Sequence, residues 1–136
     1  MTDLIAMLAA HPKADAPNHE LAEVVAAASE CAQVCLMCAD ACANETPPLG
    51  RCTRTDIDCA DVCRAVAAVF GRLPVVEPDL CAALLEACIL ATDACAAECA
   101  QHDHEHCRLC EAACRRCAEA CRQLRELWGP LARPAG

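Results

Sequence analysis

The residues of this sequence that could do chemistry are its cysteines, which make up 16 of the 136 residues. A deprotonated cysteine is a soft ligand, and soft thiolates select copper(I), zinc or iron–sulfur clusters. We expect all of them to be metal ligands. They fall into four groups along the chain: Cys31, Cys35, Cys38 and Cys42; Cys52, Cys59 and Cys63; Cys81, Cys88, Cys95 and Cys99; and Cys107, Cys110, Cys114, Cys117 and Cys121.

The spacing between neighbouring cysteines within every group is three, four or seven residues. Side chains at these separations lie on one face of an α-helix. Because four separate segments follow the same rule, each cysteine face is predicted to be the inward seam of one helix in a bundle. The thiols of the four helices would then line a shared interior channel.

Four polar residues extend these cysteine seams. Asp56 occupies the seam position between the first two cysteines of the second group, and His102, His104 and His106 lie between the third and fourth groups. We expect all four side chains to be metal ligands at the mouth of the channel. For the three histidines, a solvated polar loop is an equally good interpretation of the sequence.

The elements that must position the cysteines are separated by clusters of proline and glycine. The segments between the clusters are rich in alanine, leucine, glutamate and arginine, which favour helices. They predict helices near 18–44, 51–71, 78–101 and 104–128, with Asn18 as the first N-cap, Gly71 at a C′ position and a short extra helix over 3–10. We therefore expect one domain, 1–136, that is all-α: an antiparallel up-down-up-down four-helix bundle with a cysteine-lined core.

The seams continue past the cysteines into apolar residues at one end of the bundle. An antiparallel arrangement brings these residues together, so that end should be closed by an apolar plug and the opposite end should be the open mouth. The plug is predicted to contain Leu21, Val24 and Ala28, then Val66 or Ala67 with Phe70, and finally Leu124 and Trp128.

The charge of the chain excludes several classes of partner. With 20 acidic and 11 basic residues the formal net charge is −9, which opposes binding to nucleic acid and to anionic membranes. No apolar run reaches the length of about 20 residues that a membrane span needs. The first residues lack a basic segment, so we expect no secretory signal and a reducing cytoplasm, where disulfides are disfavoured.

The uniform cysteine stripe favours copper(I) over the other soft metals. Iron–sulfur clusters need four thiols that converge on one compact cluster, and zinc needs closed tetrahedral sites. A continuous stripe of cysteines does not divide into such groups of four. One copper(I) per thiolate leaves the core close to neutral, whereas divalent ions at that ratio would bury a large positive charge. If each sulfur bridges two ions and each ion binds two sulfurs, the capacity is about 16 ions.

Four segments of the sequence resemble the cytosolic branch of the bacterial copper storage proteins. They are CAQVCLMCADAC (31–42), CTRTDIDCADVC (52–63), CAALLEACILATDACAAEC (81–99) and CRLCEAACRRCAEAC (107–121). The resemblance implies a homotetramer of cysteine-lined bundles, with copper(I) bound by thiolates and no catalysis. It also implies metal access from the end that carries the histidines. A copper chaperone is a candidate partner.

The expected function is therefore high-capacity cytosolic copper(I) storage and detoxification. A zinc or general soft-metal sink is the main alternative, followed by an iron–sulfur or thiol–redox protein. The sequence contains CxxC pairs, but they lie inside predicted helices without the βαβ context of a thiol oxidoreductase. The cysteines could also be plain small hydrophobic residues, although a stripe of thiols fills a core poorly.

Overall fold

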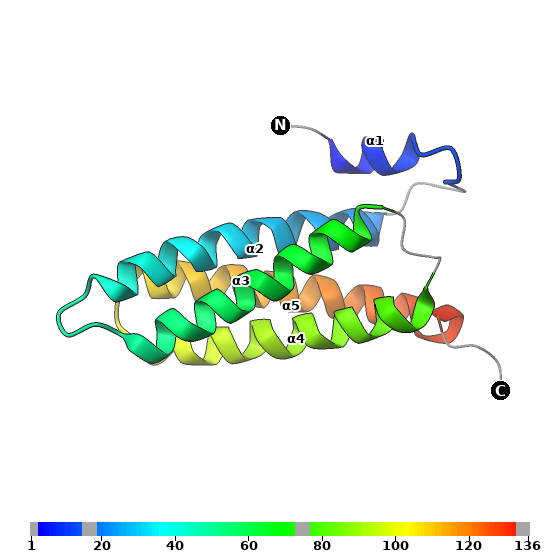
Figure 1. Cartoon of the computed structure of the whole chain (residues 1–136). Coiled ribbons are helices and arrows are strands. Elements are labelled where there is room, and N and C mark those ends of the chain that lie inside the picture. The colour runs from blue at the N-terminus through cyan, green and yellow to red at the C-terminus, as the bar shows by residue number, and fades with distance from the viewer. Residues whose placement is uncertain (1–2, 15–18, 73–76, 133–136) are drawn as a thin grey trace.

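The computed structural model describes residues 3–14, 19–72 and 77–132, and all regular structure in these ranges is helical. The four long helices form a bundle, and a short helix lies beside it (Figure 1). The predicted all-α four-helix bundle with an extra N-terminal helix is therefore confirmed. The helices are α1 (Leu4–Ala9), α2 (His19–Ala43), α3 (Gly50–Phe70), α4 (Pro78–Cys99) and α5 (Glu105–Ala132).

The long helices follow one another around the bundle. Each packs on the next along the chain, and α5 returns to pack on α2, while α1 packs on α2 from outside. The α2–α3 and α4–α5 connections lie at the same end of the bundle, at the left in Figure 1. This is the arrangement expected for short connections between antiparallel neighbours. It places the loop over 44–49 beside the histidine-rich loop over 100–104.

The predicted helix bounds hold to within about two residues except at the last helix. That helix continues past Gly129 and Pro130 to Ala132, because a proline in the last turn removes only one backbone hydrogen bond. Gly71 is the C-cap of α3 with a right-handed φ of −69°, so its predicted C′ position was wrong by one residue. Its N–H simply continues the helical pattern to the Ala67 carbonyl. The Asn18 N-cap lies outside the described residues.

The apolar plug forms at the end of the bundle opposite the two short loops. Leu21, Val24, Val66, Phe70 and Leu124 are fully buried. The aromatic ring of Phe70 stacks on that of Trp128 with a centroid distance of 5.9 Å. Of the two alternatives on α3, Val66 is buried and Ala67 only partly so. Each large apolar side chain buried here contributes about 1.5–3 kcal/mol to folding.

Two helices require a correction to the sequence analysis of membrane spans. By length and composition alone, α2 and α4 are apolar enough to cross a membrane. Their alanines and cysteines raise the mean hydropathy of both helices, but many of these residues face the interior of the bundle. In the most apolar window, 50% of α2 and 39% of α4 is buried inside the bundle. Such helices are typical of a protein core, and we draw no membrane assignment from them.

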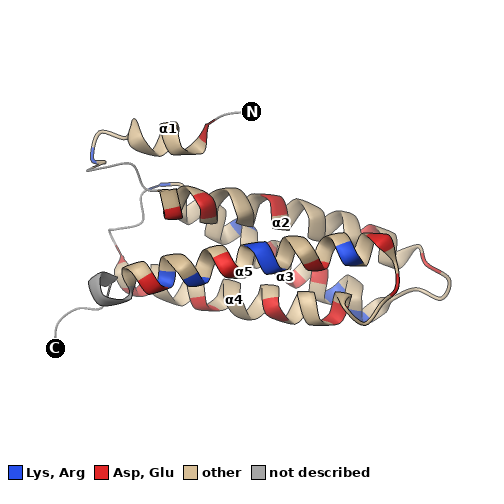
Figure 2. Cartoon of the chain, turned by 180° about the vertical axis from the view of Figure 1, so that it is seen from behind, with Lys and Arg blue, Asp and Glu red and all other residues tan. Residues whose placement is uncertain are grey.

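Acidic and basic residues are interspersed along the long helices of the bundle (Figure 2). The arginines of α5 are paired with carboxylates, three of them at 2.6–2.8 Å. Exposed pairs of this kind contribute little to stability. They neutralise the basic residues locally, so these arginines do not build a positive surface. The three pairs are Arg115–Glu111, Arg116–Glu30 and Arg125–Glu86.

Candidate metal centre

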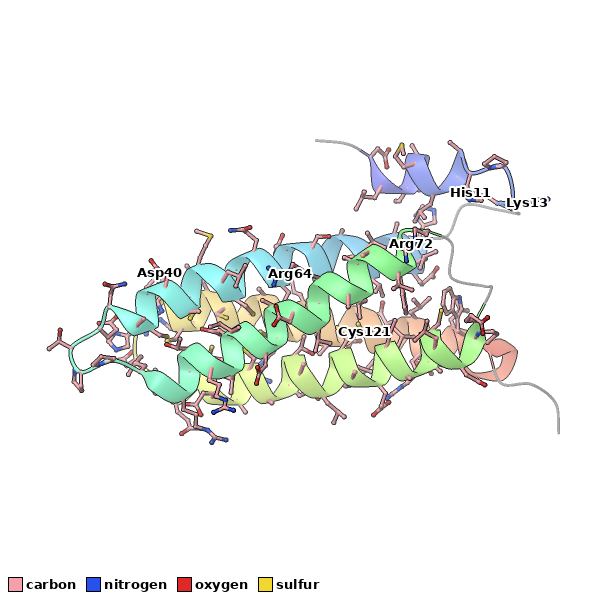
Figure 3. All side chains as sticks on the ribbon, in the orientation of Figure 1. His11, Lys13, Asp40, Arg64, Arg72 and Cys121 are labelled. Atoms are coloured by element: carbon pink, nitrogen blue, oxygen red, sulfur yellow. The ribbon has the colours of Figure 1, made fainter. Side chains whose placement is uncertain are left out.

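All 16 cysteines lie inside the bundle without forming disulfides, and none is more than 2% exposed. Figure 3 shows Cys121 lying between the helices, whereas Asp40 and Arg64 lie on the outer surface. The four cysteine faces predicted from the 3–4 spacing therefore converge on one interior. Disulfide pairing, which the sequence analysis disfavoured, is absent from all 16 positions.

A central group of thiols joins α2, α4 and α5. The Sγ atom of Cys35 lies 3.7 Å from those of Cys110 and Cys114 and 4.0 Å from that of Cys95. Cys31 lies 3.7 Å from Cys114 and 3.8 Å from Cys35. The five sulfurs come from three helices, so the centre forms only when the whole bundle is assembled.

An inner group of thiols continues from the centre toward the apolar plug. The sulfur of Cys63 lies 3.9 Å from that of Cys59 and 3.9 Å from that of Cys88, which in turn lies 3.8 Å from Cys117. Cys59 also belongs to a central quartet of sulfurs that lie within 4.8 Å of one another. The inner and central groups are therefore continuous rather than separate sites.

The outer thiols lie toward the end with the short loops. Cys38 and Cys42 are 3.8 Å apart, and Cys52 and Cys99 are 3.7 Å apart. Two sets of four ligand atoms lie within 4.8 Å of one another at this level: Cys38, Cys42, His106 and Cys107; and Cys38, Cys52, Asp56 and Cys99. Both sets contain Cys38, so this level also has no isolated site.

Asp56 is fully buried among thiols, one layer inside the rim at which we expected it. Its Oδ1 atom accepts hydrogen bonds from Cys95 at 3.0 Å and Cys110 at 3.2 Å, and Cys99 lies at 3.8 Å. Its Oδ2 atom has no hydrogen-bond partner among the described residues. Burial, together with the hydrogen bond from Cys95, raises the pKa of Asp56 to about 9. A buried oxygen without a partner is unusual and fits a ligand position.

His106 is the histidine that contacts the thiols. Its Nδ1 atom lies 3.4 Å from the sulfur of Cys38, 3.6 Å from that of Cys107 and 4.0 Å from that of Cys42. Its other ring nitrogen, Nε2, lies 2.8 Å from a carboxylate oxygen of Glu45. The hydrogen bond from His106 lowers the pKa of Glu45.

His102 and His104 have different surroundings from His106. His102 is held by Glu98 through an Nε2–Oε2 contact of 2.8 Å, and the other oxygen of Glu98 accepts from Arg51 at 2.9 Å. His104 stacks on the ring of His106 with a centroid distance of 5.4 Å. Its Nδ1 atom lies 3.4 Å from Glu45. The structure thus groups His104 and His106 together and ties His102 to a carboxylate beside them.

The sequence analysis missed both carboxylates that hold these histidines. Glu98 is 6% exposed and lies four residues before His102, which lies just after the end of α4, and this spacing could have revealed the pair. Glu45 lies in the α2–α3 connection, 61 residues from His106 along the chain. A loop residue with a partner so distant leaves no periodic signal in the sequence.

Burial raises the pKa of three thiols toward the two ends of the cysteine-lined interior. Burial raises the pKa of Cys52, and burial together with the neighbouring Cys42 raises the pKa of Cys107 to about 11. Burial also raises the pKa of Cys81, with a further contribution from the charge of Glu77. Since metal ligation requires the thiolate, binding must displace these protons. Protonated buried thiols are also poor nucleophiles.

The sulfur positions limit how metals can be bound. With metal–sulfur bonds of about 2.3 Å, two sulfurs lie about 4.6 Å apart in a linear site and about 4.0 Å apart in a trigonal one. The observed contacts of 3.7–4.0 Å are too short for a linear site and match the sulfur spacing of three- or four-coordinate ions. The central quartets are Cys31, Cys35, Cys59 and Cys114, and Cys35, Cys95, Cys110 and Cys114. They share two sulfurs, so simultaneous occupation requires bridging thiolates.

Comparison with known proteins agrees with this geometry. The family model described as Csp, copper storage protein, matches residues 17–126. The structure of the copper storage protein Ccsp from Streptomyces lividans, loaded with 10 copper equivalents, is 41% identical with a TM-score of 0.84. The match covers 90% of this chain and 97% of that one.

Two further matches support the same conclusion. A structure of a cytosolic copper storage protein from Streptomyces lividans with five coppers is 46% identical, with a TM-score of 0.74 over 77% of this chain and 91% of that chain. An uncharacterized cysteine-rich protein of Bacillus subtilis, YhjQ, is 37% identical over 92 residues, which are 65% of this chain and 81% of that protein. With its matching fold, buried cysteines and family match, this chain belongs to the copper storage protein family.

Proposed function

We propose that this protein stores copper(I) in the cytosol by binding many ions to the thiolates inside its bundle. The supporting observation is that the sulfur quartets overlap, as those around Cys35 and Cys114 do. Overlapping quartets favour bridged copper(I)–thiolate clusters, because copper(I) accepts two or three sulfurs and each sulfur can bridge two ions. They do not favour closed four-thiol zinc sites or a discrete iron–sulfur cluster.

The capacity follows from how many sulfurs each ion binds. With two sulfurs per ion and each sulfur bridging two ions, the 16 cysteines hold about 16 ions. With three sulfurs per ion and each sulfur bridging two ions, they hold about 11. The Streptomyces lividans relative loaded with 10 copper equivalents is close to the three-sulfur figure.

Copper(I) enters, in this proposal, through the end formed by the two short loops. The first ligands are His106, Cys38, Cys42 and Cys107, whose ligand atoms lie within 4.8 Å of one another. Asp56 lies in the next layer and connects the outer thiols to Cys95 and Cys110. His102 and His104 lie at the same end, held by Glu98 and Glu45. The opposite end is closed by the apolar plug.

The cytosolic location and the non-catalytic role belong to the same proposal. One Streptomyces lividans relative is described as cytosolic, and none of the 16 cysteines of this chain forms a disulfide, which suits a reducing compartment. The thiols are buried rather than exposed, which suits storage better than thiol catalysis. A copper chaperone that delivers the ion remains a candidate partner.

We further propose that the protein self-associates through the outer face of α4, in line with the tetramer that the resemblance implies. This face carries apolar residues at alternating spacings of three and four, the same period as a bundle seam. Leu80 is 51% exposed and Leu90 is 63% exposed, and the alanines between them allow close approach of a second helix. The stripe consists of Leu80, Ala83, Ala87, Leu90, Ala94 and Ala97.

A charge placed in the middle of this stripe should separate the subunits. Leu90→Glu is expected to convert the assembly to smaller species, because a second copy would have to bury the new carboxylate against apolar side chains. Sedimentation velocity measures the change. Leu109→Glu is the matched control, since Leu109 is similarly exposed at 58% but lies on α5. Dissociation by the control, or none by Leu90→Glu, would place the interface elsewhere.

A copper(I) titration against a chromogenic chelator, under anaerobic conditions, tests the storage function. We expect uptake of about 11–16 ions per chain before the chelator gains any copper. Saturation near four ions with zinc, together with weak copper(I) uptake, would instead identify a zinc sink. A brown protein as isolated would identify an iron–sulfur protein.

Two double variants test the shared sulfurs in the same titration. Cys35 and Cys114 belong to both central quartets, so Cys35→Ser with Cys114→Ser removes two bridging sulfurs and should lower the capacity by about one to two ions. Cys81→Ser with Cys121→Ser removes two sulfurs toward the closed end and, if every thiol bridges two ions, should lower the capacity by the same amount. An unchanged capacity in the central variant would show that the central thiols do not bind copper.

A further inference from the structure

The two loops at the mouth of the bundle are connected by one carboxylate. Glu45, in the α2–α3 connection, contacts Nε2 of His106 at 2.8 Å, and the same oxygen lies 3.4 Å from Nδ1 of His104. Neither the family match nor the thiol geometry gives Glu45 a role. Its position at the only histidine in contact with the described thiols is the observation from which we start.

The contact with Glu45 decides where the proton of a neutral His106 lies. An ionised carboxylate can only accept a hydrogen bond, so Nε2 must be the nitrogen that carries hydrogen. In a neutral imidazole the other nitrogen then has a free lone pair. That nitrogen, Nδ1, is the one that lies 3.4–4.0 Å from the sulfurs of Cys38, Cys107 and Cys42.

We propose that Glu45 is a positioning residue for copper loading, which fixes the Nε2–H tautomer and the ring orientation of His106 so that Nδ1 faces the outermost thiols. Carboxylates that accept from the second nitrogen of a metal-binding histidine act in this way in many metal sites. The inference rests on the proposed storage function, because it assigns Nδ1 of His106 as a copper ligand.

His104 supports the same ring orientation from the other side. Its ring lies nearly parallel to that of His106, at an interplanar angle of 9°, and it shares Glu45. A stacked neighbour resists rotation of the imidazole, and rotation would move Nδ1 away from the sulfurs. The carboxylate of Glu45 and the stacked ring of His104 thus fix one orientation of the His106 ring. On this account His104 assists His106 and does not need to bind copper itself.

The first test reads the tautomer without copper. Long-range nitrogen–proton NMR spectra of the apo protein, recorded near pH 9 where imidazoles are usually neutral, distinguish the two tautomers of His106. The wild type should show the Nε2–H form. Glu45→Ala should show a mixture, whereas Glu45→Gln, which keeps a carbonyl acceptor, should retain mostly the Nε2–H form. A wild-type tautomer in Glu45→Ala overturns the proposal.

The second test measures the rate of loading by stopped-flow transfer from a copper(I)–chelator complex. Glu45→Ala should load at least about 10-fold more slowly than the wild type but reach the same final number of ions. Glu105→Gln is the control: it removes one charge at the same end, but its partner is Arg108. Its rate should stay within about twofold of the wild type.

The outcomes separate this proposal from the storage function. Equal loading rates in the wild type and Glu45→Ala, or equal slowing in Glu105→Gln, overturn the role of Glu45 and leave storage intact. Failure of the wild type itself to take up copper would overturn the storage function instead. The tautomer measurement does not depend on copper, so it gives its answer in either case.

Discussion

Loading this protein with copper(I) is expected to raise the midpoint of thermal unfolding by more than about 20 °C. Several of the largest buried side chains lie at the plug, and much of the remaining interior consists of cysteines and alanines, whose small side chains contribute little packing. A ligand at 100 times its dissociation constant stabilises the native state by about 2.7 kcal/mol per site. With several sites filled, and about 4 °C per kcal/mol for a chain of this size, the shift becomes large.

Calorimetry of the apo and fully loaded protein under anaerobic conditions measures this shift. Phe70→Ala is a suitable control, because Phe70 lies in the plug and should lower both midpoints by a similar amount. The difference between the apo and loaded midpoints should survive that substitution. A loaded protein that unfolds at the apo temperature would show that the metal does not bind inside the bundle.

The stability of the apo protein is expected to fall as the pH rises from about 4 to about 9, because of Asp56. Burial raises the pKa of this carboxyl from 3.8 to about 9 in the native state. Over that range the native protein keeps a proton that the unfolded chain loses, so each rise in pH favours the unfolded chain. The total effect is on the order of several kcal/mol, and it is complete once the pH passes about 9.

Denaturant titrations of the apo protein between pH 5 and pH 9 measure this slope. Asp56→Asn cannot ionise, so it should flatten the slope and make the apo protein more stable than the wild type at pH 8. Asp58→Asn, an exposed change two residues further along α3, should leave the slope unchanged. If Asp56→Asn keeps the wild-type slope, Asp56 is ionised in the native protein and the explanation is wrong.

Much of the fold could be predicted because the cysteines themselves mark the inward faces of the helices. A side chain such as Cys88 or Cys117 must lie on the seam, and a seam with a period of three and four residues fixes the face that each helix turns inward. The same rule explains Thr92, which occupies the seam position between Cys88 and Cys95. It is fully buried, and its hydroxyl donates to the Cys88 carbonyl at 2.7 Å.

The depth of a seam residue could not be read from the pattern. Asp56 follows the seam rule and was expected at the mouth, but the relative axial positions of α3, α4 and α5 place it beside Cys95 and Cys110. The axial positions of the helices depend on how they pack against one another. The spacing of residues within a single helix carries no information about this packing. The sequence therefore predicted the face of Asp56 but not its layer.

Contacts made by loops were also beyond the sequence pattern. Three histidines within five residues suggested one shared role. In the structure, however, His102 contacts Glu98 and His106 contacts Glu45. The second pairing arises only because the antiparallel order brings the two short connections to the same end. Loop side chains have no periodic constraint, so their partners follow from the assembled fold rather than from the sequence around them.

X-ray absorption at the copper edge of the fully loaded protein tests the central claim most directly, because it reports the oxidation state and the atoms bound to the metal. The account predicts copper(I) with two or three sulfur neighbours at about 2.3 Å for nearly all ions, together with short copper–copper distances from bridging thiolates. A first shell dominated by nitrogen or oxygen, or sulfur shells without copper neighbours, would contradict it.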